Sequence, residues 1–139
     1  RDRDVNRYAD FCRRILNTAG FKVANRSAPV YYIVEQLEKI GDGYRDICTY
    51  ASKNRLRMSK DVGRLYEEVN SLLQHFYGLY YTFSLAKMTE FGKVCGVLKQ
   101  RITEHLKETD KASLPLLVEL WGIVDNLFDI NGAVMTERM

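Results

Sequence analysis

The chain has 139 residues, of which 46% are hydrophobic and 28% are charged, with a formal net charge of +3 at pH 7. This length suits one domain, or two very small ones, with room for a sizeable core. The modest charge gives no reason to expect nucleic-acid binding. No apolar run approaches the roughly 18 residues that a membrane-spanning helix needs.

The cellular location is indicated by the start of the chain and by the cysteines. Residues 1–4 alternate arginine and aspartate, so no signal peptide is expected there. The absence of an initiator methionine suggests a fragment of a longer protein. Three cysteines, odd in number and far apart, are typical of a reducing compartment. A cytoplasmic protein is therefore expected.

Helical spacing of apolar residues, with only two prolines in the chain, predicts an all-α protein. The capping residues Ser27, Ser59 and Ser113 mark three helix starts, and a proline lies two residues after Ser27 and Ser113. Short connections imply antiparallel neighbours in a bundle. The five expected helices cover residues 4–18, 27–54, 59–80, 85–106 and 113–135.

The aromatic run at residues 76–83 is wider than one helical stripe. It is interpreted first as a helix end buried between neighbours. The alternative is an exposed patch that binds a partner.

An acidic stripe distinguishes the second expected helix. At about 100° per residue, one face of residues 33–48 is apolar and the opposite face is acidic. Like charges one turn apart are unfavourable, so something should compensate them. Lys39 and Arg45 could do so on a solvated face, or the carboxylates could bind a hard metal cation. The apolar face comprises Ile33, Leu37, Ile40, Tyr44, Ile47 and Ala51, and the acidic face Glu35, Glu38, Asp42 and Asp46.

The segment Leu-Glu-Lys-Ile-Gly-Asp at residues 37–42, followed by Asp-Ile-Cys at 46–48, resembles the signature helix of the PhoU family of phosphate-uptake regulators. That family carries a metal-binding glutamate and aspartate four residues apart, which correspond here to Glu38 and Asp42. Asp46 stands where the family often has asparagine, and so adds an oxygen ligand.

A second copy of this pattern occurs near the end of the chain. Residues 120–125 and 129–130 overlay residues 37–42 and 46–47 with a constant offset, since 125 − 42 = 83 and 130 − 47 = 83. A helical period of this length suggests two copies of one bundle. The resemblance implies tandem three-helix repeats: residues 1–56 as an incomplete first repeat with two helices, and residues 57–139 as the second with three.

The second copy keeps Asp125 and Asp129 but has lost other acids. Trp121 replaces the glutamate and Val118 occupies the position of Glu35. Metal binding is therefore expected mainly at repeat one, and a protein contact at Trp121. The resemblance also implies that Asp2 and Asp4 of the preceding helix can approach the acidic stripe.

Other classes of function are less well supported. His75 and His105 have no spacing typical of a catalytic pair, and no glycine-rich phosphate loop is present, so catalysis is not expected. A di-iron carboxylate bundle would need a Glu-x-x-His motif and inward-facing ligands. A helical interaction module without metal is the serious alternative.

The sequence thus predicts a PhoU-like regulator of phosphate uptake that acts by protein contacts. The resemblance implies the phosphate transporter's ATPase subunit and a sensor kinase as partners, and a homo-oligomer is expected. The expected cofactor is a divalent or trivalent metal ion, with magnesium, calcium, manganese or iron favoured over zinc. A further helix should cover the wide apolar face of the first two helices.

Overall fold

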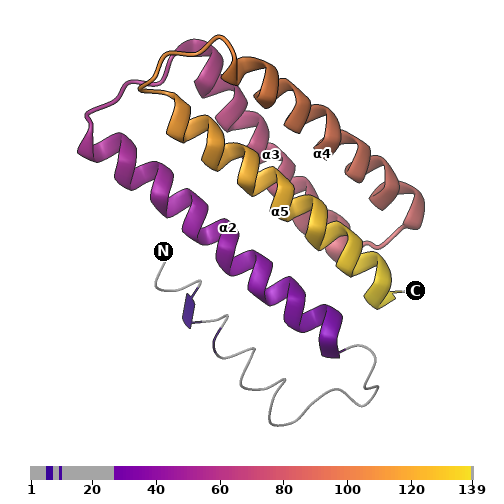
Figure 1. The fold of residues 1–139 in the computed structure, drawn as a ribbon. Coiled ribbons are helices and arrows are strands. Elements are labelled where there is room, and N and C mark those ends of the chain that lie inside the picture. The colour runs from indigo at the N-terminus through magenta and orange to yellow at the C-terminus, as the bar shows by residue number, and fades with distance from the viewer. Residues whose placement is uncertain (1–5, 8–9, 11–26, 139) are drawn as a thin grey trace.

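The computed structural model describes residues 6–7, 10 and 27–138, and its long helices run alternately up and down (Figure 1). They are α2 (Ser27–Lys53), α3 (Lys60–Tyr81), α4 (Leu85–Leu106) and α5 (Leu114–Arg138). No strand occurs in the described ranges, which confirms the all-α fold. The helix expected over residues 4–18 lies almost entirely outside the described residues. None of the described helices is long and apolar enough to cross a membrane.

Local sequence signals set the ends of these helices. The Ser59 hydroxyl accepts a hydrogen bond from the Val62 backbone N–H at 3.3 Å, and Ser84 caps α4 in the same way. These caps satisfy donors that the first helical turn leaves unpaired. At the end of α2, Arg55 has a φ of 48°, and the Leu56 N–H donates to the Ala51 carbonyl at 2.9 Å. This left-handed cap lets the chain turn toward α3.

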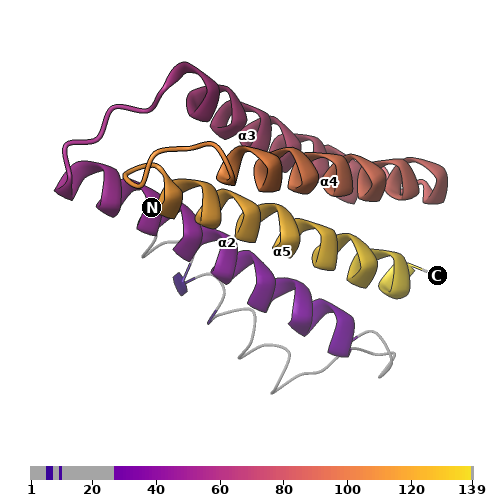
Figure 2. The ribbon, with the colours of Figure 1, turned by 45° about the horizontal axis from the view of Figure 1, so that its top comes forward.

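The last helix, α5, is the centre of the bundle. It packs against α2, α3 and α4, and lies between α2 and the α3–α4 hairpin in both views (Figures 1 and 2). A helix with neighbours on several sides must be apolar over most of its circumference. Accordingly, α5 contributes the largest share of the described core: Leu116, Leu117, Leu120, Ile123, Val124, Leu127, Ile130 and Val134.

The buried face of α2 differs from the predicted apolar stripe. Ile33, Ile40 and Ile47 are buried as expected, but Leu37 is 39% exposed. Gln36 and Gly43 are buried instead. Relative to the predicted orientation, α2 is therefore rotated about its own axis, so that the side carrying Gly43 faces α5.

Close approach of α2 and α5 explains this rotation. A Cβ atom placed on Gly43 would lie 3.0 Å from Cγ1 of Ile123 on α5. That distance is tighter than ordinary van der Waals contact, so any larger side chain at residue 43 would require Ile123 to move by a few tenths of an ångström. By contrast, a Cβ on Gly122 of α5 would meet nothing within 4 Å.

This difference predicts opposite effects of filling the two glycines. Gly43→Val should lower the free energy of unfolding by about 1–3 kcal/mol, because the new side chain overpacks against Ile123. Gly122→Ala should raise it by up to about 1 kcal/mol, because alanine favours the helix and the site is open. Urea unfolding of both variants would measure this, and a stabilising Gly43→Val would contradict the close packing.

Candidate functional site

The four predicted acids of α2 lie outside the core, as expected. Glu35, Glu38 and Asp42 are half-buried and Asp46 is exposed. They lie on the side of the helix away from Ile33, Ile40 and Ile47. The structure therefore confirms the separation into an apolar and an acidic face.

An arginine on the same helix partly neutralises these acids. Arg45 places one guanidinium nitrogen 3.2 Å from Oδ1 of Asp42 and another 3.2 Å from Oδ1 of Asp46. All three side chains are 39–49% exposed, and exposed pairs of this kind stabilise a protein by less than about 1 kcal/mol. A cation that bound Asp42 and Asp46 together would have to displace Arg45, which such weak pairs would permit.

The second copy of the motif is arranged differently. Nζ of Lys99, on α4, lies 2.8 Å from Oδ1 of Asp125 and forms both a hydrogen bond and an ion pair with it. The same ammonium lies 5.1 Å from the ring centroid of Trp121 and 5.2 Å from that of Phe128. Asp125 thus already holds a cation from its own chain, in an aromatic setting that strengthens the interaction.

Acids from both copies meet along one side of the α2–α5 contact. Burial, and then the negative charge of Asp46, raise the pKa of Glu119 on α5. Toward the other end of the contact, burial and then the negative charge of Asp129 on α5 raise the pKa of Tyr32 on α2. Asp46 and Asp129 occupy equivalent positions in the two copies, since 129 − 46 = 83.

The two copies are thus brought together by antiparallel pairing. Gly43 meets Ile123 near the middle of the contact, and the Tyr50 hydroxyl donates to the Ala112 carbonyl at 2.9 Å at one end. We call the acidic face of α2 (Glu35, Glu38, Asp42 and Asp46), which reaches α5 where Asp46 approaches Glu119, together with Glu119 and Asp129 of α5, the acidic seam.

The donor chemistry of the acidic seam suits a hard cation, but its geometry does not by itself form a site. In the described part of the chain, no group of three or more histidine, cysteine, aspartate or glutamate side chains is arranged to hold a metal ion. Asp2 and Asp4, the additional ligands implied by the resemblance, lie outside the described residues. The metal site at Glu38, Asp42 and Asp46 therefore stays a prediction.

Sequence reasoning missed two features of this region. Neither the pairing of Lys99 with Asp125 nor the approach of Tyr32 to Asp129 was predicted. Lys99 is 26 residues from Asp125 and on another helix, so periodicity within one helix cannot show the contact. A half-buried lysine beside a tryptophan could have been suspected only once α4 and α5 were known to be adjacent.

Comparison with known proteins adds no assignment, because no family model, curated protein or solved structure matched the chain.

Proposed function

We propose that this protein is a PhoU-like regulator of phosphate uptake that acts by protein–protein contacts through the acidic seam. The supporting observation is the antiparallel packing of two helices that carry the same motif 83 residues apart. The two motif segments pack side by side, so acids from both copies border one surface, and a charged surface of this kind suits recognition of a protein partner.

The proposed partners follow from the resemblance: the phosphate transporter's ATPase subunit, a sensor kinase, or both, in the cytoplasm. The seam offers them mostly carboxylates, with Arg45 and Lys39 as neighbouring cations. Acidic surfaces favour partners with basic surfaces and accelerate their association at low salt. A divalent or trivalent metal ion on Glu38, Asp42 and Asp46 would neutralise most of their negative charge, so metal binding would change which partner surface fits.

A second candidate is a helical interaction module that needs no metal. Arg45 pairs with Asp42 and Asp46, and Lys99 pairs with Asp125. These internal cations lower the repulsion that a metal ion would otherwise relieve. In that case the seam would recognise its partner by its own charge pattern alone.

Metal titration of purified protein distinguishes the two candidates. With Mn²⁺ as the probe, we expect Asp42→Asn to lower affinity at least tenfold and Asp125→Asn to change it less than threefold, because Lys99 already occupies Asp125. Glu38→Ala should behave like Asp42→Asn and change the free energy of unfolding by less than about 0.5 kcal/mol. Equal losses from Asp42→Asn and Asp125→Asn would contradict the predicted asymmetry, and no binding by the wild type would favour the metal-free module.

Binding to the partners tests the regulatory role itself. The purified ATPase subunit and the cytoplasmic part of the sensor kinase would be titrated by calorimetry, with and without Mn²⁺. We expect at least one to bind, and charge reversal of the seam by Asp46→Lys to weaken that binding at least tenfold. Glu104→Lys makes the same change of charge at an exposed position on α4, away from the seam, and should leave binding unchanged. Absence of binding by both partners would refute the proposal.

A further inference from the structure

One exposed face of α4 carries charged and apolar residues in a regular order. Its members follow one another at intervals of three or four residues in strict alternation, which keeps them on one side of the helix. The same alternation is typical of the contact face of a helix that pairs with another helix. We call this face the α4 stripe, and its members, all of them exposed, are Lys87, Glu90, Val94, Val97, Arg101 and Glu104.

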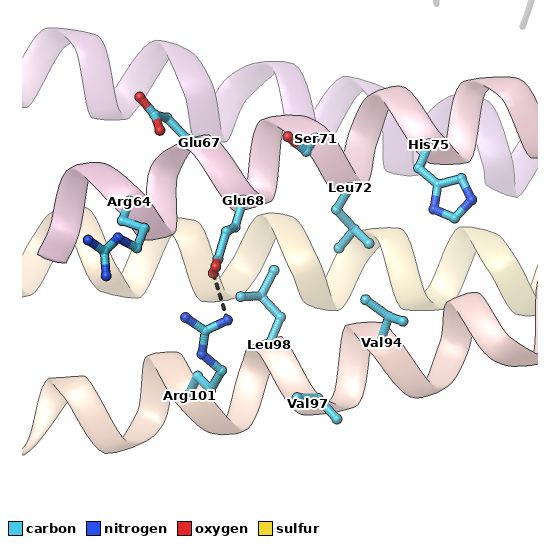
Figure 3. A pocket seen from close by; sticks show the side chains of 10 residues that line it. All are labelled: Arg64, Glu67, Glu68, Ser71, Leu72, His75, Val94, Val97, Leu98 and Arg101. Carbon is cyan, nitrogen blue, oxygen red and sulfur yellow. Dashed lines mark ion pairs between the residues drawn. The ribbon is translucent and has the colours of Figure 1, made fainter.

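The centre of the α4 stripe is apolar and borders a hollowed surface. Val94 and Val97 are 42% and 62% exposed. Beside them, between α3 and α4, are two hollows of about 490 and 580 Å³ that share His75 and Val94 in their linings. Leu72 and Leu98, each 5% exposed, lie between the helices there (Figure 3). This apolar surface could be removed from water by a partner.

The net charge of this surface does not select a partner, because bases and acids balance at each end. The charged lining residues are Arg64, Glu67, Glu68 and Arg101 at one end, and Lys87 and Glu90 at the other. Neither an acidic nor a basic surface is therefore favoured overall. The order of the charges along the stripe is what can distinguish one partner from another.

That order is its own complement when it is reversed. Read forward, the stripe is base, acid, valine, valine, base, acid. Two copies of α4 lying antiparallel, with a two-fold axis passing between Cys95 and Gly96, would therefore place opposite charges against each other and valine against valine. The opposed pairs would be Val94 with Val97, Glu90 with Arg101, and Lys87 with Glu104. A parallel pairing in register would place every charge against a like charge.

We propose that the α4 stripe is the contact of a symmetric homodimer, in which two copies of α4 pair antiparallel with their valines at the centre. A two-fold contact requires one patch to complement itself, and the stripe meets this requirement in both its charges and its apolar residues. A contact with a different protein would need no such symmetry. The second copy is therefore the occupant that the sequence of the stripe favours.

The ion pairs within one chain are compatible with this contact. Glu90 lies 3.9 Å from the ammonium of Lys93, and both side chains are at least 70% exposed, so this pair is weak. Nη1 of Arg101 lies 2.8 Å from Oε2 of Glu68. A guanidinium has five N–H donors, so Arg101 can keep Glu68 and also bind Glu90 of the second copy.

The contact is small, so the dimer should be weak. The stripe spans about 26 Å, nearly five helical turns, and only its centre is apolar. Interfaces at the lower end of the size range are typical of transient complexes. We expect a dissociation constant of about 10–100 μM.

Sedimentation equilibrium of the wild type and two matched valine variants tests the proposal, at loading concentrations from about 1 to 500 μM. Val97→Glu should weaken dimerisation by about tenfold or more, because it places a carboxylate against Val94 of the second copy. Val118→Glu, at a 56% exposed valine of α5 outside the stripe, should leave it unchanged. Circular dichroism melts would establish that both variants are folded. A monomeric wild type over this range, or equal effects of the two variants, would overturn the proposal.

A charge exchange at the ends of the stripe tests the antiparallel orientation. Among the described residues neither Lys87 nor Glu104 forms an ion pair. Lys87→Glu should weaken dimerisation severalfold, because it opposes Glu104 of the second copy, and Lys87→Glu combined with Glu104→Lys should restore the wild-type constant. Residue 87 is the third position of a helix capped by Ser84, where glutamate is favourable, so the single change should not loosen α4. Failure of the double variant to restore dimerisation would refute the antiparallel pairing.

The dimer contact and the acidic seam can be tested separately. The stripe lies on α4, whereas the seam lies on α2 and α5. Loss of the dimer should therefore leave partner binding at the seam unchanged, and loss of partner binding should leave the dimer intact. A stripe variant that abolished both would contradict the placement of the two surfaces on different sides of the bundle.

Discussion

Leu127→Ala is expected to lower the free energy of unfolding by about 2–5 kcal/mol, as large-to-small changes in closely packed cores do. Leu127 is completely buried, and it lies on α5, which packs against all three of the other described long helices. A cavity at such a position cannot be filled by the movement of one neighbour alone. The cost should therefore lie in the upper part of that range.

Urea unfolding followed by the fluorescence of Trp121, the only tryptophan in the chain, would measure this effect. Trp121 is half-buried on the same helix, so its emission should report the loss of α5 packing. The transition midpoint should fall while the denaturant slope stays constant. Val118→Ala is the matched control: this α5 valine is exposed, so its truncation should change stability by less than about 0.5 kcal/mol. Similar losses in both variants would show that α5 is not the centre of the bundle.

The helices were largely predictable because their signals are local. Ser59 accepts the expected capping bond, and α4 begins and ends at the expected residues, 85 and 106. Caps and apolar periodicity act within one or two turns, so they can be read from a short stretch of sequence. The same holds for the separation of acids from isoleucines on α2.

The contacts between helices were less predictable, because they depend on which helices become neighbours. Leu37 is exposed and Gln36 is buried because Gly43 allows α2 to approach Ile123 closely. A hydrophobic pattern weights leucine above glutamine and glycine, and it carries no information about the shape of the facing helix. Burial within the aromatic run at residues 76–83 also depends on which side of α3 meets its neighbours. Phe76 is buried, whereas Tyr77 and Tyr81 are each 67% exposed.

The sequence identified the acidic residues of the candidate site, but not all of the side chains that pair with them. All four α2 acids lie on one face, and Arg45, which the sequence suggested as a neutraliser, pairs with Asp42 and Asp46 on the same helix. The pairing of Lys99 with Asp125 joins two helices and was not predicted. Ion pairs between helices form wherever long side chains can reach, so sequence spacing alone does not select among them.

Alkaline pH is expected to destabilise the protein through Tyr44. This tyrosine of α2 is half-buried against the edge of Tyr66, with ring centroids 6.1 Å apart, and its buried hydroxyl has no hydrogen-bond partner among the residues that the structure describes. Burial, and then the charge of Tyr66, raise the pKa of Tyr44 from 10.0 to about 12. Between these two values the unfolded chain loses the phenolic proton and the folded chain keeps it. Stability is therefore fully present below pH 10 and falls as the pH rises toward 12.

Tyr44→Phe should remove this dependence. A two-unit difference in pKa corresponds to about 2.7 kcal/mol, and partial solvent contact of the ring reduces the effect to about 2 kcal/mol. At pH 7 the variant should be as stable as the wild type or slightly more so, because the hydroxyl it removes makes no hydrogen bond to any described residue. Urea unfolding at pH 8 and pH 11.5 would measure the difference, with Tyr31→Phe, at an exposed tyrosine of the same helix, as the control. Burial raises the pKa of Cys95 to about 12 as well, so some loss of stability should persist in both variants. If Tyr44→Phe and Tyr31→Phe lose equal stability on going to pH 11.5, the Tyr44 hydroxyl is ionised as readily in the folded protein as in the unfolded chain.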